Sequence, residues 1–194
     1  MIHLVLGKQG DGKTLFLVKK AYEKYRKGYT VYSNVHLNFP YKHIKVDDII
    51  NCKLQNGVVI WDEIHIHLPA RRSLSKTNVK ICDGFLSMVR KKNLEIFGST
   101  QTTRKVDVRF RDEADYLYQC KKQIMYKNTF VPARHDKEYS LDTDVYIKLT
   151  IAEKNTEDFF TMQEEVKYIY KRFKANPYYN LYDSKQIIKI EGLD

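Results

Sequence analysis

The sequence predicts an α/β fold in which a mostly parallel β-sheet, flanked by helices, continues into an antiparallel β extension toward the C-terminus. A short apolar run at residues 2–6 leads through glycines into an amphipathic segment, as a strand leads into a helix. A second apolar run at residues 58–61 lies between a glycine and two acids, which is typical of a strand buried on both faces of a parallel sheet. Strand-like runs separated by polar turns at residues 123–131, 145–152 and 159–162 predict the antiparallel extension.

The loop after the first strand contains every fixed position of the phosphate-binding pattern G-x-x-x-x-G-K-[ST]. Glycines let the backbone N–H groups of such a loop point at the α- and β-phosphates, and the helix N-terminus adds favourable dipoles. We therefore predict an ATP site. Its phosphate-binding residues are Gly7, Lys8, Gln9, Gly10, Asp11, Gly12, Lys13 and Thr14.

Two residues of this loop also have predicted chemical roles. Lys13 would reach the β- and γ-phosphates, so it is a candidate catalytic residue as well as a binding residue. The Thr14 hydroxyl would hold Mg²⁺, a cation that prefers oxygen ligands. The helix that starts here should end near Lys27, because Gly28 suits the position that follows a helix C-terminus.

The next elements are a strand and a short helix. β-Branched and aromatic residues at 30–33 predict a strand parallel to the first, whose C-terminal end at Ser33 and Asn34 should lie near the nucleotide. Residues 46–50 form the one short helix that the following mixed stretch predicts.

The buried strand at residues 58–61 ends in an acid pair, which is a Walker B pattern. Asp62 would hold Mg²⁺ through water, and Glu63 would polarise the water that attacks the γ-phosphate. Any buried strand can end in acids, but this one follows a complete phosphate-binding loop. Together the two motifs predict an Mg²⁺-dependent ATPase.

A loop is predicted at residues 64–78 by its proline and serines. His65 and His67 stand beside acids as metal ligands would, but no third protein ligand is evident and Mg²⁺ prefers oxygen. Arg71 and Arg72 fit two interpretations equally well: a solvated pair of charges, or guanidinium groups aimed at phosphate on a neighbouring subunit.

A core helix is predicted at residues 79–89, where apolar residues recur at helical spacing, and it ends in a basic turn that suits its dipole. Residues 94–101 have strand character and end in small polar residues. Gln101 at this strand tip fits either a sensor of the γ-phosphate and the lytic water, or a simple turn glutamine. Gln101 is therefore a candidate catalytic residue.

No arginine is securely placed to meet the charge that develops at the γ-phosphate inside one subunit. We therefore expect an arginine from a neighbouring subunit to supply it, since the planar guanidinium forks onto phosphate oxygens. For each candidate taken singly, a role within its own subunit or a contact with DNA fits as well. The candidates are Arg71, Arg72, Arg90, Arg109 and Arg111.

The composition favours a polyanionic partner inside a cell. Lys and Arg outnumber Asp and Glu by 34 to 24, a formal charge of +10 that suits DNA, although general solubility also explains it. Three well-separated cysteines predict free thiols rather than disulfides or a zinc site. No window approaches a membrane span and no signal peptide is evident, so we expect a cytoplasmic protein, in the host cytoplasm or associated with virions if it is viral.

The stretch at residues 164–183 interleaves aromatic and basic side chains. Such a pattern is typical of contact with nucleic acid or with a partner subunit. It also fits a terminal helix that packs its tyrosines on the core, and the sequence favours this helix.

The ordered combination of these motifs resembles the zonula occludens toxin (Zot)-like ATPases and the related FtsK/HerA translocases. The features that carry the resemblance are the phosphate-binding loop, residues 33–35, the strand and acid pair at 58–63, the arginine-bearing loop, the helix ending in Arg90 and Lys91, and residues 99–101 and 106–111. They cover about the first 120 residues, and residues 179–184 are similar to the ending of several viral members. The resemblance implies a parallel sheet between helices, a ring of identical subunits such as a hexamer, and DNA or an assembling virion as substrate.

Many Zot-like proteins of filamentous phages carry a membrane anchor after the ATPase core, and this chain shows none. This departure favours the DNA-packaging or DNA-translocating members over phage extrusion. We expect one domain over residues 1–194, with a nucleotide-binding core at 1–122 and an antiparallel extension and C-terminal tail at 123–194.

Three functions are compatible with these motifs. The first is an ATP-hydrolysing motor that translocates or packages DNA, most simply double-stranded, in a virus or mobile element. The second is a nucleotide-gated assembly or extrusion module, and the third is a small P-loop kinase. Glu63 argues against a kinase, because a base that activates water would waste ATP by hydrolysis.

Overall fold

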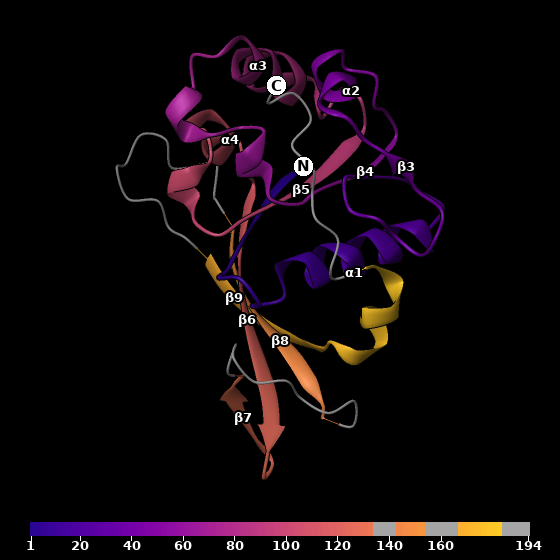
Figure 1. Ribbon diagram of the computed structural model, residues 1–194, viewed down its shortest axis with the longest axis vertical. Helices are drawn as coiled ribbons and strands as arrows, with labels where there is room; N and C mark the ends of the chain where they lie inside the picture. Colours follow the sequence, from indigo (N-terminus) through magenta and orange to yellow (C-terminus); the bar gives the residue numbers. More distant parts are fainter. Residues whose placement is uncertain (134–142, 154–166, 184–194) are drawn as a thin grey trace.

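The computed structural model describes residues 1–133, 143–153 and 167–183, and their strands form one mixed sheet. The strand order is β3-β2-β4-β5-β1-β6-β8-β9, and β7 pairs with β6 (Figure 1). The first five strands are all parallel to one another. Their bounds are β1 (Ile2–Leu6), β2 (Thr30–Ser33), β3 (Lys42–His43), β4 (Gly57–Trp61) and β5 (Leu94–Thr100). The predicted parallel sheet is therefore confirmed.

The antiparallel half of the sheet begins at β6 (Tyr116–Tyr126), which pairs in parallel with β1 and antiparallel with β8 (Val145–Glu153). The outer strand β9 (Lys167–Lys174) pairs antiparallel with β8. This confirms the predicted antiparallel extension, although the predicted strand at residues 159–162 lies outside the described residues.

The predicted strand at residues 123–131 is a hairpin instead of one strand. The end of β6 turns into β7 (Thr129–Pro132) through Lys127 and Asn128. Both turn residues have positive φ, at 45° and 61°, which is the type I′ geometry that matches strand twist. A Lys-Asn pair is a weaker signal for this turn than Asn-Gly. The strand predicted from the sequence therefore included the two turn residues.

Helices cover the parallel half of the sheet on both faces. One face is covered by α1 (Lys13–Tyr25), whose apolar residues pack with Val58, Ile60 and Phe97. The opposite face is covered by α2 (Val46–Ile50), by α3 (Lys76–Val79) with its π-helical continuation η3 (Lys80–Leu86), and by α4 (Val108–Asp112). The shorter 3₁₀ turns are η1 (Ile64–Ile66), η2 (Ala70–Arg72) and η4 (Thr103–Lys105).

Several element boundaries follow from local chemistry. Helix α1 ends at Tyr25, close to the predicted Lys27, and Gly28 follows at φ 82°, where glycine carries no steric penalty. The predicted helix at residues 79–89 forms, but its middle is π-helical. No helix among the described residues is long and apolar enough to cross a membrane.

The terminal helix expected within residues 164–183 is wrong. The chain instead forms strand β9 and the 3₁₀ segment η5 (Asn176–Leu181). In β9 the partly buried Ile169 and Phe173 pack against the α1 core, whereas Tyr168 and Tyr170 are exposed. This alternation with period two is the signature of a half-buried strand, in which aromatic residues are also common.

Candidate nucleotide-binding site

The phosphate-binding loop lies between the C-terminal end of β1 and the N-terminus of α1. Gly10 and Gly12 have φ values of 81° and 89°, which favour glycine. The loop is braced internally, because the backbone N–H of Lys8 donates to Asp11 Oδ2 at 2.7 Å. A Cβ added at Gly12 would meet the end of the Ile147 side chain on β8, which would have to shift, so glycine is favoured here mainly by the backbone conformation.

Lys13 is buried at the first position of α1 and its ammonium group curls back over the loop. Its Nζ donates to the carbonyl of Lys8 at 3.3 Å and lies 3.9 Å from Glu63 Oε1. A buried cation needs an anion nearby, and the carboxylate supplies that charge. The arrangement holds the lysine where a phosphate on the loop would meet it.

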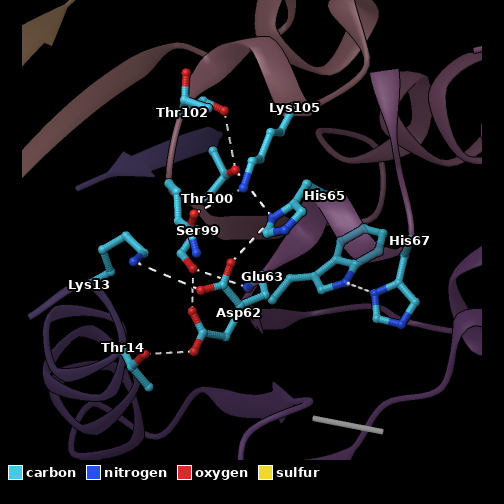
Figure 2. Close-up of polar contacts among 12 residues, drawn as sticks. Lys13, Thr14, Asp62, Glu63, His65, His67, Ser99, Thr100, Thr102 and Lys105 are labelled. Atoms are coloured by element: carbon cyan, nitrogen blue, oxygen red, sulfur yellow. Dashed lines mark hydrogen bonds and ion pairs between the residues drawn. The ribbon is translucent and has the colours of Figure 1, made fainter. Parts of the chain in front are cut away.

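Asp62 connects three strands of the sheet to the helix N-terminus (Figure 2). The Thr14 hydroxyl donates to its Oδ2 at 2.7 Å, and the Ser99 hydroxyl on β5 donates to its Oδ1. Asn34, just after β2, holds the backbone of Asp62 from both sides: its Nδ2 donates to the carbonyl at 2.9 Å, and its Oδ1 accepts from the N–H at 2.8 Å. The carboxylate is therefore fixed beside the hydroxyl with which it is predicted to share a metal.

Glu63 sits at a strained corner of the chain with φ 50°, directly after β4. Its N–H donates to Ser99 Oγ at 3.1 Å, and its Oε2 lies 3.2 Å from His65 Nδ1. Burial raises the pKa of Glu63, and the Asp62 charge adds to this while Lys13 opposes it. Burial also lowers the pKa of His65, with help from Lys105 and Lys13, so neutral imidazole is favoured beside the carboxylate.

The two histidines after Glu63 do not converge on a metal position. His67 Nδ1 accepts from Trp61 Nε1 at 3.1 Å, whereas His65 Nδ1 also lies 3.3 Å from the Thr100 hydroxyl (Figure 2). In the described part of the chain no group of three or more His, Cys, Asp and Glu side chains is placed to hold a metal ion.

Gln101, the predicted sensor, is exposed just beyond β5, and its Oε1 accepts from Lys105 Nζ at 2.9 Å. The β5 side chain that meets the acid pair is Ser99, two residues earlier. The sensor role of Gln101 stays a prediction. The signal that finds Ser99 is strand geometry, since alternate residues of a strand point to the same face.

The five candidate arginines occupy different surroundings, and none of them lines the pocket described below. Arg109 is held within its own subunit by Asp107, Asp83 and the carbonyl of Ser73. Arg90 forms an ion pair with Asp115 at 3.3 Å and is mostly exposed. Arg71 and Arg72 are exposed on η2, while Arg111 is partly buried on α4.

A pocket of about 510 Å³ opens in front of the loop. It is lined by residues of the phosphate-binding loop and the acid pair, and also by Lys122, Ile147, Tyr179 and Tyr182. The two tyrosines belong to the C-terminal segment, which is fastened to the chain after β2: the Asn38 N–H donates to the Leu181 carbonyl at 2.8 Å. Burial raises the pKa of Tyr182 to about 12. No local pattern of residues indicates that this segment reaches the pocket.

Three features place the chain in the P-loop NTPase fold class. They are the strand–loop–helix unit, the acid pair after the parallel strand β4, which β5 separates from β1, and the order of the strands in the sheet. The structure is similar over most of its length to the N-terminal domain of zonular occludens toxin from Neisseria meningitidis. The two share 19% sequence identity with a TM-score of 0.59, over 94% of this chain and 98% of that one. At this identity the likeness shows a shared fold, which is the fold that the Zot-like resemblance predicted.

Two weaker likenesses were found. The flagellar accessory protein FlaH from Methanocaldococcus jannaschii gives 14% identity and a TM-score of 0.48, over 77% of this chain and 76% of that one. The DNA-packaging ATPase B204 from Sulfolobus turreted icosahedral virus gives 15% identity and a TM-score of 0.47, over 86% and 95%. Neither TM-score supports an inference. No protein-family model and no curated protein matches the sequence.

Proposed function

We propose that this protein is an ATP-hydrolysing P-loop motor that translocates or packages DNA in a virus or mobile element, working as a ring of identical subunits. The observation that supports hydrolysis is the position of Glu63, a partly buried carboxylate with a raised pKa that lies 3.9 Å from the ammonium group of Lys13. A carboxylate in that position can accept a proton from an attacking water.

The donor set of the site fits ATP with Mg²⁺. The loop glycines leave room for phosphate oxygens against backbone N–H groups, and Lys13 supplies a cation that stays beside them. The Thr14 hydroxyl and the Asp62 carboxylate are hydrogen-bonded to each other at 2.7 Å, so one oxygen-loving cation would be held by Thr14 directly and by Asp62 through water. When bound, Mg²⁺ neutralises phosphate charge.

Residues of this chain set the surroundings of Glu63, the proposed proton acceptor. Lys13 Nζ lies 3.9 Å from one carboxylate oxygen of Glu63, and the imidazole of His65 lies 3.2 Å from the other. A γ-phosphate competes with Glu63 for Lys13, so substrate binding weakens the ion pair and leaves the carboxylate more basic. Glu63 is therefore proposed as the general base, and its environment favours hydrolysis over phosphoryl transfer to another substrate.

DNA as the partner is supported by charge and by the sequence resemblance. The formal charge of +10 favours a polyanion, and release of counterions from DNA phosphates would make binding strongly dependent on salt. An assembly or extrusion module with incidental hydrolysis would not need DNA to reach its full turnover. Stimulation of ATP hydrolysis by DNA therefore separates the two functions.

The first experiment is the substitution Lys13→Ala. It removes the charge that faces the β- and γ-phosphates, so ATP hydrolysis should be abolished and ATP affinity weakened, as measured by phosphate release and by titration calorimetry. Lys27→Ala is the control, because Lys27 is an exposed lysine beyond the end of α1 and outside the phosphate-binding loop. Unchanged turnover in Lys13→Ala would remove the assigned site.

A further inference from the structure

The antiparallel half of the sheet has one face that no described helix covers. Its other face packs on α1, where Ile147, Leu149 and Cys120 are buried in the core. We call the uncovered side the open sheet face; it consists of alternate residues of β6 from Gln119 to Met125, of β8 from Tyr146 to Ala152, and of β9 from Tyr168 to Lys174. In Figure 1 this part of the sheet extends away from α2, α3 and α4.

Three cations form a row across the open sheet face. Lys121 on β6 is directly opposite Lys148 on β8, which is directly opposite Arg172 on β9. Directly opposed residues on neighbouring strands are close, so like charges there repel and destabilise the sheet. The strand positions of this face include no acid, and no described residue forms an ion pair with any of the three. A bound polyanion would relieve this repulsion.

Aromatic rings stand among these cations. Tyr168 and Tyr170 on the outer strand β9 are 60% and 67% exposed, although a tyrosine ring normally gains by burial. Lys148 Nζ lies 5.5 Å from the centre of the Tyr170 ring, and Arg172 stacks at 3.6 Å on the ring of Phe130. The rings of Tyr170 and Phe130 thus each have a cation of the row beside them.

We propose that the open sheet face binds single-stranded nucleic acid. Lys121, Lys148 and Arg172 would contact phosphates, while Tyr168 and Tyr170 would stack on bases. Exposed rings on a sheet favour a single strand, because a duplex keeps its base faces stacked on one another. The inference rests on the proposed function only in taking the polyanion to be DNA, and it adds a single-stranded contact to the double-stranded partner expected from the sequence.

The test measures binding of a dye-labelled oligothymidylate by fluorescence anisotropy without ATP. The double variant Tyr168→Ala/Tyr170→Ala should weaken affinity by about 5- to 150-fold for each base that loses its ring, and a duplex of equal length should be affected much less. Tyr29→Ala is the matched control: Tyr29 is also exposed and also has a lysine, Lys24, 5.2 Å from its ring centre, but it lies after α1.

Two further variants separate stacking from charge and from folding. Tyr170→Phe keeps the ring and should keep the affinity. Lys148→Gln should lower the slope of log affinity against log salt by about 0.7, the value for one phosphate contact on a single strand. Thermal melting of each variant confirms that it is folded.

The inference is overturned if the wild type does not bind the oligonucleotide, or if the double variant binds it equally well. It is also overturned if duplex affinity falls by the same factor, or if the double variant changes only the oligomeric state, which would make β9 a contact between copies. Because the assay contains no ATP, these outcomes are independent of the proposed ATPase. The binding results can therefore be interpreted whether or not Lys13→Ala loses hydrolysis.

Discussion

Glu63 is the residue on which the proposed hydrolytic function depends. Its carboxylate is partly buried at the end of β4, beside a second carboxylate, and still faces Lys13. The strained φ of 50° turns its side chain toward the phosphate-binding loop, while Asp62 before it turns toward Thr14. Two adjacent acids thereby take separate roles.

Glu63→Gln should therefore keep ATP binding and lower kcat by about 10²- to 10⁴-fold, the usual cost of losing a general base. Since burial and Asp62 raise the pKa of Glu63, the acid limb of kcat/KM in the wild type should lie above the ordinary glutamate value of about 4.3. Phosphate-release assays over a range of pH, with calorimetry for binding, measure both effects. A variant that loses ATP binding instead would make Glu63 a metal-holding residue.

At the scale of elements, the C-terminal segment is the unexpected part of the site. It returns from β9 to the chain after β2. Tyr179 and Tyr182 of this segment line the pocket together with residues of the phosphate-binding loop. Tyr178 on the same segment faces away, with its ring 5.9 Å from that of Phe173. Adjacent tyrosines thus divide between the pocket and the core.

This division predicts a difference between ligands. Tyr179→Ala should weaken ATP binding by about 2- to 10-fold, the value of one aromatic contact, and leave inorganic tripolyphosphate binding unchanged, because the ring meets the nucleoside and the loop meets the phosphates. Tyr178→Ala is the matched control and should change neither affinity. Equal losses for ATP and tripolyphosphate in calorimetry would show that the segment only supports the fold.

The motifs and strands with strong local signals were predictable from sequence. The bounds of β2 and α2 match the predicted residues, and β4 and β5 differ by single residues at their ends. Their signals are local: β-branched runs, glycines and terminal acids. The loop pattern likewise predicts which residues surround the phosphate position, and the predicted roles of Lys13, Thr14, Asp62 and Glu63 remain to be tested.

The contacts that depend on distant parts of the chain were not predictable. Asn34 and Ser99 meet Asp62 because β2, β4 and β5 are neighbours in the sheet, which no local pattern records. The C-terminal segment reaches the pocket only because β9 sets its starting point. The helix prediction there was wrong because aromatic residues occupy both partly buried and exposed positions of β9. The period-two alternation of burial therefore cannot be seen in the sequence.

At the scale of the whole molecule, no arginine in the described part of the chain lines the pocket beside the phosphate-binding loop. Arg109 is occupied by Asp107 and Asp83, so the exposed Arg71 and Arg72 on η2 are the better candidates for a neighbouring subunit. Such arginines are worth about 10³ to 10⁵ in rate.

Mixing two inactive proteins tests this arrangement. Lys13→Ala, which keeps its arginines, should restore hydrolysis when added to the double variant Arg71→Ala/Arg72→Ala, which keeps its loop. Turnover per site in the wild type should also rise with protein concentration as rings assemble. If no mixture complements and turnover is independent of concentration, the protein acts as a monomer.

The most direct measurement of the central claim is the steady-state rate of ATP hydrolysis with and without DNA, at low salt, for the wild type and for Lys13→Ala. The account predicts that DNA raises the wild-type rate, that added salt removes the increase by displacing the protein from phosphates, and that Lys13→Ala shows no hydrolysis in either case. A wild-type rate that is the same with and without DNA would contradict a DNA motor.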